Sequence, residues 1–169
     1  MIRAVLLDFG ETLVERISDR DAPLTQLSPV PFPETGAVLA ELKRAGYLLG
    51  VVTNTERTDD EAMDRVLTSI GIRGHLDTAV TSVSTGSRKP DSAIFLRALE
   101  RLGCSTAEAV MVGDDAAVDI GGGAALGMAT ILVRRRRFEL PETNADFVVT
   151  SLRDLAPVIN RLRAATGDS

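Results

Sequence analysis

Residues 4–12 read AVLLDFGET, a run of four apolar residues that stops at Asp8. Short apolar runs bounded by polar residues are typical of buried strands in a parallel sheet. The same pattern returns, in part more weakly, at residues 48–52, 78–80, 109–112, 129–133 and 147–149. These runs alternate with amphipathic stretches, which predicts an α/β domain. We expect a central, mainly parallel sheet of five to six strands with helices on both faces.

The intervening stretches carry helix signals. Helices are predicted at residues 34–45, 58–70, 90–102 and 151–163. Thr58 and Glu61 form a capping box for the second of them, and Pro90 lies in the first turn of the third. Three glycines at 121–123 lie where a further helix is expected, and each costs about 1 kcal/mol relative to alanine. That helix is therefore either soft or very close to a neighbour.

Length and composition exclude several classes of protein. A chain of 169 residues predicts a single domain over residues 1–169. A formal net charge of −5 argues against binding to nucleic acid or to an anionic membrane surface. Residues 120–133 form the longest apolar stretch without charge, and it is too short to span a membrane. Cys104 is the only cysteine and His75 the only histidine, which excludes an internal disulfide and the usual zinc sites built from four cysteine or histidine ligands. A cytoplasmic location fits this composition.

Polar residues follow the predicted strands. Asp8 ends the first, Thr53 and Asn54 end the second, and Asp114 follows the fourth, with Asp119 one helical turn later. The carboxyl ends of parallel strands meet at one edge, so the three acids are expected to converge and repel unless a cation lies among them. Oxygen ligands select a hard ion such as Mg²⁺. The alternative is that these aspartates cap the following helices, the role that we expect for Asp115.

Four segments in this order resemble the motifs of the haloacid dehalogenase-like hydrolase superfamily. They are DFGET at residues 8–12, VVTN at 51–54, RKPD at 88–91 and GDDAAVD at 113–119. The resemblance covers nearly the whole chain and implies a three-layer, Rossmann-like fold.

The resemblance also implies a phosphatase chemistry. Asp8 would attack phosphorus to give an aspartyl-phosphate, and Asp8, the carbonyl of Gly10 and Asp114 would hold Mg²⁺. Asp119 would not bind the ion directly. It would orient either the water ligands of the metal or the side chain of Lys89.

Three residues of the second and third motifs are implied to bind the substrate. Thr53 would donate a hydrogen bond to a phosphoryl oxygen, beside Asn54. Lys89 would place its positive charge over the developing negative charge.

One departure from the family pattern concerns the second aspartate of the first motif, which is Gly10 here. In related phosphatases that aspartate protonates the leaving group and then activates water, help that is worth ~10²–10⁴-fold. Glu11 is a weak candidate for this role, because in extended backbone it would point away. The expected function is therefore a slow Mg²⁺-dependent phosphomonoesterase. The alternatives are a degraded domain that binds metal and anions, a metal-independent dehalogenase, or a phosphotransferase.

The chain leaves no room for the cap domain of larger superfamily members. Only residues 13–33, a Pro-rich excursion, stand in its place. An open site of this kind suits a large phosphorylated substrate or relies on a partner subunit, such as a second copy, to exclude water. His75 and Cys104 are expected to be packing or surface residues. The arginines at 134–137 are expected to be a solvated charge run, with attraction of an anionic substrate as the alternative.

Overall fold

A computed structural model describes residues 1–19, 21–135 and 142–165. Its strands are β1 (Ala4–Leu7), β2 (Leu48–Thr53), β3 (Thr78–Thr81), β4 (Ala109–Gly113), β5 (Ala129–Val133) and β6 (Phe147–Val149). They form one sheet in the order β3-β2-β1-β4-β5-β6, and every neighbouring pair is parallel. The predicted parallel sheet of five to six strands is confirmed.

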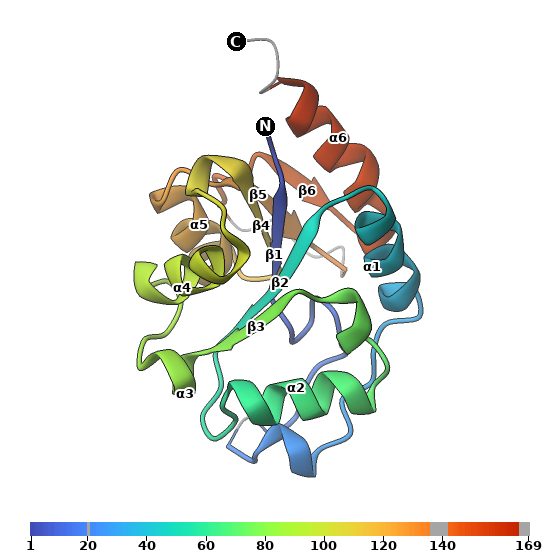
Figure 1. The fold of residues 1–169 in the computed structure, drawn as a ribbon, viewed down its shortest axis with the longest axis vertical. Coiled ribbons are helices and arrows are strands. Elements are labelled where there is room, and N and C mark those ends of the chain that lie inside the picture. The colour runs from blue at the N-terminus through green and yellow to red at the C-terminus, as the bar shows by residue number, and fades with distance from the viewer. Residues whose placement is uncertain (20, 136–141, 166–169) are drawn as a thin grey trace.

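Six α-helices accompany the strands among the described residues. They are α1 (Thr35–Arg44), α2 (Asp60–Ser69), α3 (Ser82–Thr85), α4 (Ser92–Leu102), α5 (Gly121–Ala125) and α6 (Leu155–Ala165). Short 3₁₀ turns lie at Leu24–Gln26, Arg73–His75, Thr106–Glu108 and Leu152–Asp154, and a π-helical turn at Ala116–Ile120 leads into α5. Helices lie on both sides of the sheet, with α4 and α5 on one face and α1 and α6 on the other (Figure 1).

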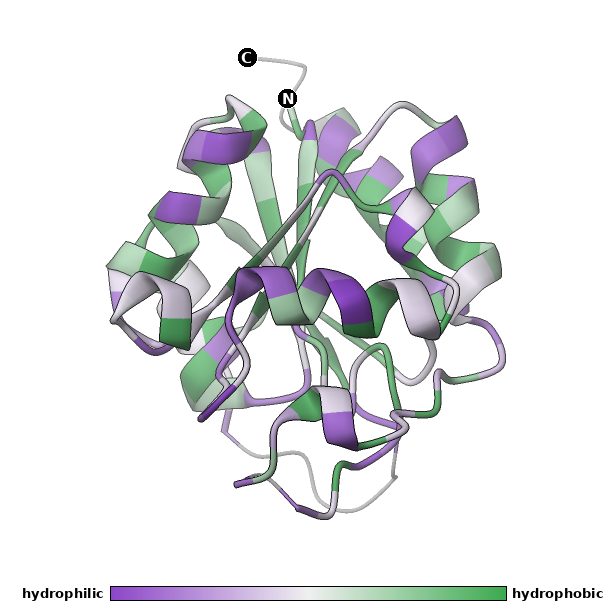
Figure 2. Ribbon diagram, turned by 60° about the horizontal axis from the view of Figure 1, so that its bottom comes forward, coloured by the Kyte–Doolittle hydropathy of each residue, from purple (hydrophilic) through white to green (hydrophobic). Residues whose placement is uncertain are grey.

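Side-chain alternation in the strands builds a core on each face. Val5 and Leu7 of β1 pack with buried residues of α1, α2 and α6, whereas Ala4 and Leu6 pack with those of α4. The central strands are thus apolar on both sides, as a sheet covered by helices requires. Figure 2 shows the hydrophobic strands enclosed between helices whose outer sides are hydrophilic.

The strand order reverses at β1. The chain proceeds from β1 to β2 and β3 on one side, and then returns to β4, β5 and β6 on the other. In such sheets ligands bind beyond the carboxyl ends of the two strands on either side of the reversal. The residues that follow β1 and β4 therefore lie where a site is expected.

Two helix starts differ from the prediction. The cap of α2 is Asp59, not Thr58, because the Thr58 hydroxyl oxygen accepts a hydrogen bond (2.9 Å) from the backbone N–H of Leu24. Pro90 precedes α4 instead of lying in its first turn, and Asp91 is the cap. In both cases a carboxylate accepts the first free N–H groups of the helix.

The Pro-rich excursion is folded against the core. In its described part, residues 13–19 and 21–33, it holds one 3₁₀ turn and an antiparallel bridge between Val14 and Pro31. Leu24 is buried, and its contact with Thr58 fastens the excursion next to α2. This segment lies at the carboxyl edge of the sheet, beyond the ends of the strands (Figure 1).

The glycines of α5 allow the backbone to approach its neighbours closely. A Cβ on Gly122 would lie 2.7 Å from the ring of Phe95, and one on Gly123 would lie 2.9 Å from Cβ of Met111. Neither distance is compatible with an added methyl group unless the neighbour moves. The glycines at 121–123 were predicted to mean either a weakly stable helix or a close approach to a neighbour, and the structure supports the close approach.

Gly122→Ala is expected to lower the free energy of unfolding by about 1–3 kcal/mol, the usual cost of overpacking a core. Gly121→Ala is the matched control. Its Cβ would meet only the Ala116 carbonyl oxygen at 3.6 Å, so it should gain up to about 1 kcal/mol in helix propensity. Urea denaturation of both variants measures the difference, and equal effects would refute the close-packing explanation.

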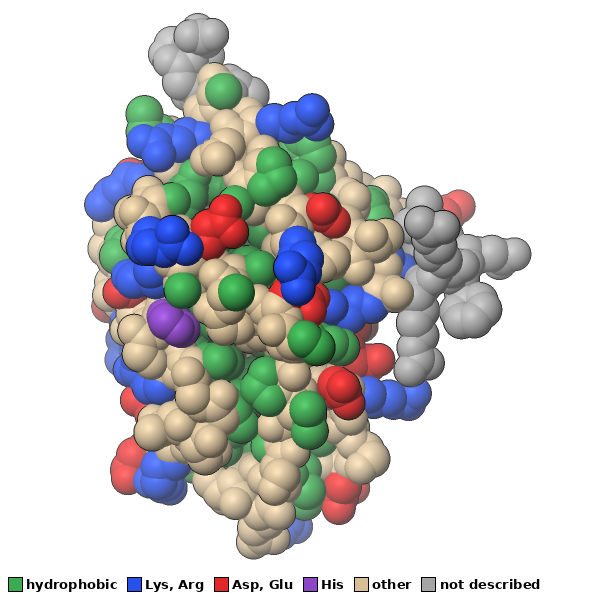
Figure 3. Space-filling model, turned by 90° about the vertical axis from the view of Figure 1, so that its right-hand side faces the viewer, with side chains coloured by type: hydrophobic (Ala, Val, Ile, Leu, Met, Phe, Trp, Pro, Cys, Tyr) green, Lys and Arg blue, Asp and Glu red, His purple; other side chains and the backbone are tan. Residues whose placement is uncertain are grey.

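Charged side chains of both signs are interspersed on the face formed by α1 and α6 (Figure 3). This face therefore presents a mixed surface and not a field of one sign. Within the described ranges, no helix is long and apolar enough to cross a membrane.

Candidate active site

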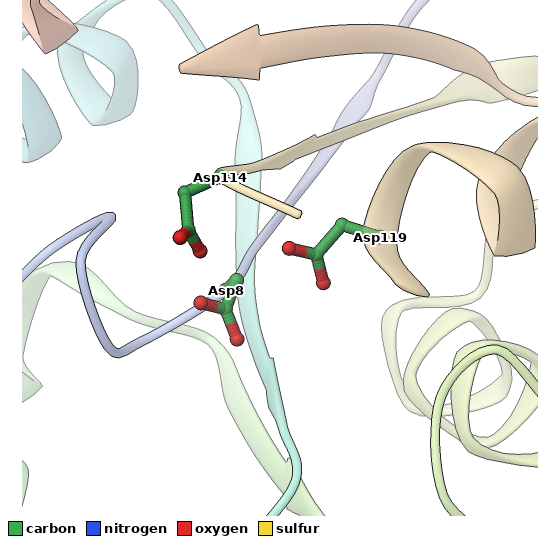
Figure 4. A group of neighbouring side chains, drawn as sticks. All are labelled: Asp8, Asp114 and Asp119. Atoms are coloured by element: carbon green, nitrogen blue, oxygen red, sulfur yellow. The ribbon is translucent and has the colours of Figure 1, made fainter. Parts of the chain in front are cut away.

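Three aspartates converge at the carboxyl ends of β1 and β4. Asp8 directly follows β1, Asp114 directly follows β4, and Asp119 projects from the π-helical turn (Figure 4). One carboxylate oxygen of each lies within 4.8 Å of those of the other two. Asp119 can come this close because Gly113 has no side chain, and the Asp119 carboxylate occupies the space that a Cβ there would need.

A buried lysine binds two of these carboxylates. Nζ of Lys89 lies 2.6 Å from Oδ1 of Asp8 and 2.7 Å from Oδ1 of Asp119, and the residue is only 5% exposed. Burial alone lowers the pKa of Lys89, but the two ion pairs outweigh it and hold this pKa above its usual value. Lys89 therefore carries its positive charge at neutral pH.

The second motif fixes the backbone of the third. The side chain of Asn54 accepts a hydrogen bond from the backbone N–H of Lys89 (2.8 Å) and donates one to its carbonyl oxygen (3.1 Å). Asn54 follows β2, so this pair of bonds joins the loop that carries Lys89 to the sheet edge. Thr53, the last residue of β2, is buried beside it.

Negative charge is concentrated without full compensation. Burial, and then the charges of Asp8, Asp119 and Glu11, raise the pKa of Asp114 to about 7. Burial and the charge of Asp8 likewise raise the pKa of Asp119 to about 6, although Lys89 pulls it down. An oxygen-only donor set whose members repel one another fits a hard divalent cation such as Mg²⁺.

The predicted site residues line one cavity of about 320 Å³. It is bordered by Asp8, Gly10, Glu11, Thr53, Asn54, Lys89, Asp114 and Asp119. The Pro-rich excursion contributes a largely apolar wall, with Ile17 and Leu24. His75 and Cys104 do not border this cavity. Asp115 caps the following turn, as expected, by accepting hydrogen bonds from two backbone N–H groups.

The expectation that Glu11 stands in extended backbone is wrong. Its φ is 57°, in the left-handed region that non-glycine residues seldom adopt. The turn brings its side chain to the border of the cavity, and its charge contributes to the raised pKa of Asp114. Glu11 is thus closer to the site than an extended strand would place it.

The arginines after β5 also differ from the prediction of a solvated run. The guanidinium of Arg135 lies 2.6 Å from Oε1 of Glu34, donates to the Thr12 carbonyl oxygen at 2.9 Å and stands 3.4 Å above the ring of Phe32. Arg134 is half-buried beside it. The pairing was not predictable, because Glu34 lies 101 residues earlier. Residues 136 and 137 lie outside the described part of the chain.

Thr12, the last residue of the first motif, contacts Asp8, and its sequence pattern predicts no role for it. It is fully buried, and its hydroxyl donates a long hydrogen bond (3.4 Å) to Oδ2 of Asp8. Since Oδ1 of Asp8 accepts from Lys89, both oxygens of this carboxylate are held. Its place in the motif, four residues after Asp8, was the available signal.

The sheet order, with an acidic cluster at the reversal point, defines a Rossmann-like α/β domain. A buried pair of a carboxylate and a lysine lies at the carboxyl edge of its sheet. Residues 8–133 match the haloacid dehalogenase-like hydrolase family, and the chain belongs to that family of hydrolases.

Named relatives include phosphatases. The chain is 40% identical over 118 residues to the glyceraldehyde 3-phosphate phosphatase of Methanothermobacter thermautotrophicus, a match that covers 70% of this chain and 50% of the relative. It is 34% identical over 125 residues to the phosphoserine phosphatase of Thermus thermophilus, covering 73% and 49%. The chain thus spans about half the length of these curated relatives.

Solved structures agree with the fold. A crystal structure of an uncharacterized protein from Listeria monocytogenes serotype 4b matches with a TM-score of 0.83 at 28% identity, covering 96% of this chain and 99% of that one. The crystal structure of a HAD phosphatase from Thermococcus onnurineus matches with a TM-score of 0.72 at 29% identity, covering 80% and 62%.

Proposed function

We propose that the protein is a Mg²⁺-dependent phosphatase that hydrolyses a phosphomonoester through an aspartyl-phosphate on Asp8. The observation that carries this proposal is the buried pair of Lys89 and Asp8 beside Asp114, at the reversal point of the sheet. Its named relatives, which include phosphatases, support the same chemistry.

The proposed reaction begins at the carboxylate of Asp8. Hydrogen bonds from Lys89 and Thr12 hold its two oxygens, and Asp8 borders the cavity in which one of them would attack phosphorus. The bond from phosphorus to the ester oxygen breaks, and the leaving oxygen takes up a proton from water. Water then cleaves the acyl-phosphate, which releases phosphate and restores Asp8.

Charge is the main difficulty, because an anionic nucleophile attacks an anionic substrate. Lys89 offsets part of this charge, and Thr53, which borders the cavity, would donate a hydrogen bond to a phosphoryl oxygen. Asp8, the Gly10 carbonyl and Asp114 would hold Mg²⁺, which supplies further neutralisation when bound. Asp119 is the positioning residue, since it accepts from Lys89 through Oδ1 and from the N–H of Asp115 through Oδ2 (3.1 Å).

The excursion at residues 13–33 takes the place of a cap in this proposal. Ile17 and Leu24 give the cavity one apolar wall, which restricts water on that side. At about 320 Å³ the cavity is larger than a phosphoryl group requires.

A second candidate is a domain that binds metal and anions without turnover. Gly10 favours it, because no carboxylate stands where the general acid of the related phosphatases would be. A rate measurement distinguishes the two candidates.

Hydrolysis of 4-nitrophenyl phosphate, with Mg²⁺ and with excess chelator, tests the proposal. This leaving group needs little protonation, so the lack of an acid at Gly10 is partly masked. We expect phosphate release that depends on Mg²⁺. Binding of Mg²⁺ and phosphate without turnover would instead establish the second candidate.

A further inference from the structure

A second, larger cavity adjoins the proposed reaction site. It measures about 570 Å³, and it shares Asp114 and Glu11 with the smaller cavity that holds Asp8 and Lys89. Asp114 and Glu11 therefore form a border that is common to both cavities. The volume lies in the range of pockets that hold small organic ligands.

Three arginines line this cavity. Arg16 of the excursion and Arg134 and Arg135 after β5 all border it. The charge of Arg135 is already balanced by Glu34, at 2.6 Å. Arg16 makes no hydrogen bond or ion pair among the residues that the structure describes, so its guanidinium is available to a ligand.

The acidic residues of the cavity lie mainly on the shared border. Asp114 belongs to the carboxylate cluster that fits Mg²⁺, and Glu11 stands next to it. Glu15, the third acid, is exposed on the excursion. The lining therefore combines the proposed metal ligand Asp114 with three arginines.

The wall is held in place by Arg135. Its guanidinium joins Glu34, the Thr12 carbonyl and the ring of Phe32, which fixes the end of β5 against both ends of the excursion. A wall anchored in this way can position a ligand group at a set distance from the reacting phosphorus.

We infer that this cavity is the leaving-group site and that it selects phosphomonoesters whose leaving group carries a second anionic group, a carboxylate or a phosphate, bound by Arg16. This inference rests on the proposed phosphatase function and adds a substrate class to it. A guanidinium binds either anion through paired hydrogen bonds, so the site recognises the shared chemistry.

Phosphonates that cannot be hydrolysed test the site by calorimetry in excess Mg²⁺. One series carries a terminal carboxylate two to five carbons from phosphorus, and the other carries an alkyl chain of the same length. We expect at least one carboxylate to bind about tenfold more tightly than its alkyl partner, the usual gain from one charge-assisted contact. Arg16→Gln should abolish this preference, and Arg16→Lys should restore part of it.

The matched control is Arg97→Gln, which removes an arginine that pairs with Glu100 on the surface of α4. It should keep the preference. Equal binding of the two series, or a preference that survives Arg16→Gln, overturns the inference. Turnover of 4-nitrophenyl phosphate is measured separately. If the protein hydrolyses this ester but binds both series equally, only the inference about the leaving-group site is overturned. If there is no turnover, the proposed function is overturned, while calorimetry still shows whether Arg16 binds an anionic group.

Discussion

Asp8→Asn is expected to lower Mg²⁺-dependent hydrolysis of 4-nitrophenyl phosphate by at least about 10³-fold, the scale of loss when a nucleophile is removed. The amide has nearly the size of the carboxylate but cannot attack phosphorus or provide the same charge to Lys89 and a cation. Initial rates at saturating Mg²⁺ measure the loss, and circular dichroism confirms that the variant is folded.

Asp91→Asn is the control for this change. Asp91 caps α4 two residues after Lys89 but does not border the cavity, and asparagine caps helices about equally well. Its rate should stay close to that of the unmodified chain. If Asp8→Asn keeps a comparable rate, the aspartyl-phosphate mechanism is wrong.

Gly10→Asp is expected to increase hydrolysis of alkyl phosphates by about 10²–10⁴-fold, because it supplies the missing general acid. The structure leaves room for the side chain. A Cβ on Gly10 would meet only Ile17, at 3.9 Å, and the φ of Gly10 is not positive. Aryl phosphates should gain much less, since their leaving groups need little protonation. The ratio of kcat/KM values for glycerol 2-phosphate and 4-nitrophenyl phosphate measures the effect.

Gly10→Asn separates acid chemistry from packing, because asparagine has the same shape without a proton to give. It should leave that ratio unchanged. Glu11→Gln addresses the other candidate acid, since Glu11 borders the cavity. A selective loss of alkyl phosphate hydrolysis in Glu11→Gln, with no gain in Gly10→Asp, would assign the acid to Glu11 and refute our reading of Gly10.

The sheet edge was predictable because its cause is local. An apolar run buried on both faces must end where the first charged residue appears, and that is how Asp8 and Asp114 were placed. Their meeting at one edge follows from parallel strands and the strand order. The roles proposed for these side chains in the reaction remain predictions until the variants are measured.

The features that sequence reasoning missed depend on partners distant in the chain. Thr58 has the sequence pattern of a helix cap, but its hydroxyl oxygen accepts a hydrogen bond from the backbone N–H of Leu24 in the excursion. Asp59 caps the helix instead. Arg135 looks like part of a solvated run until the fold brings Glu34 beside it. Local propensity carries no information about such long-range contacts.

Lysine is rare in this chain, because only two of its nineteen lysine and arginine residues are lysines, and Lys89 is one of them. An ammonium is compact and fits between two carboxylates at 2.6 and 2.7 Å, where a planar guanidinium would force them apart. Arginine is the usual basic residue elsewhere in this chain, but at position 89 it would not fit between the two carboxylates.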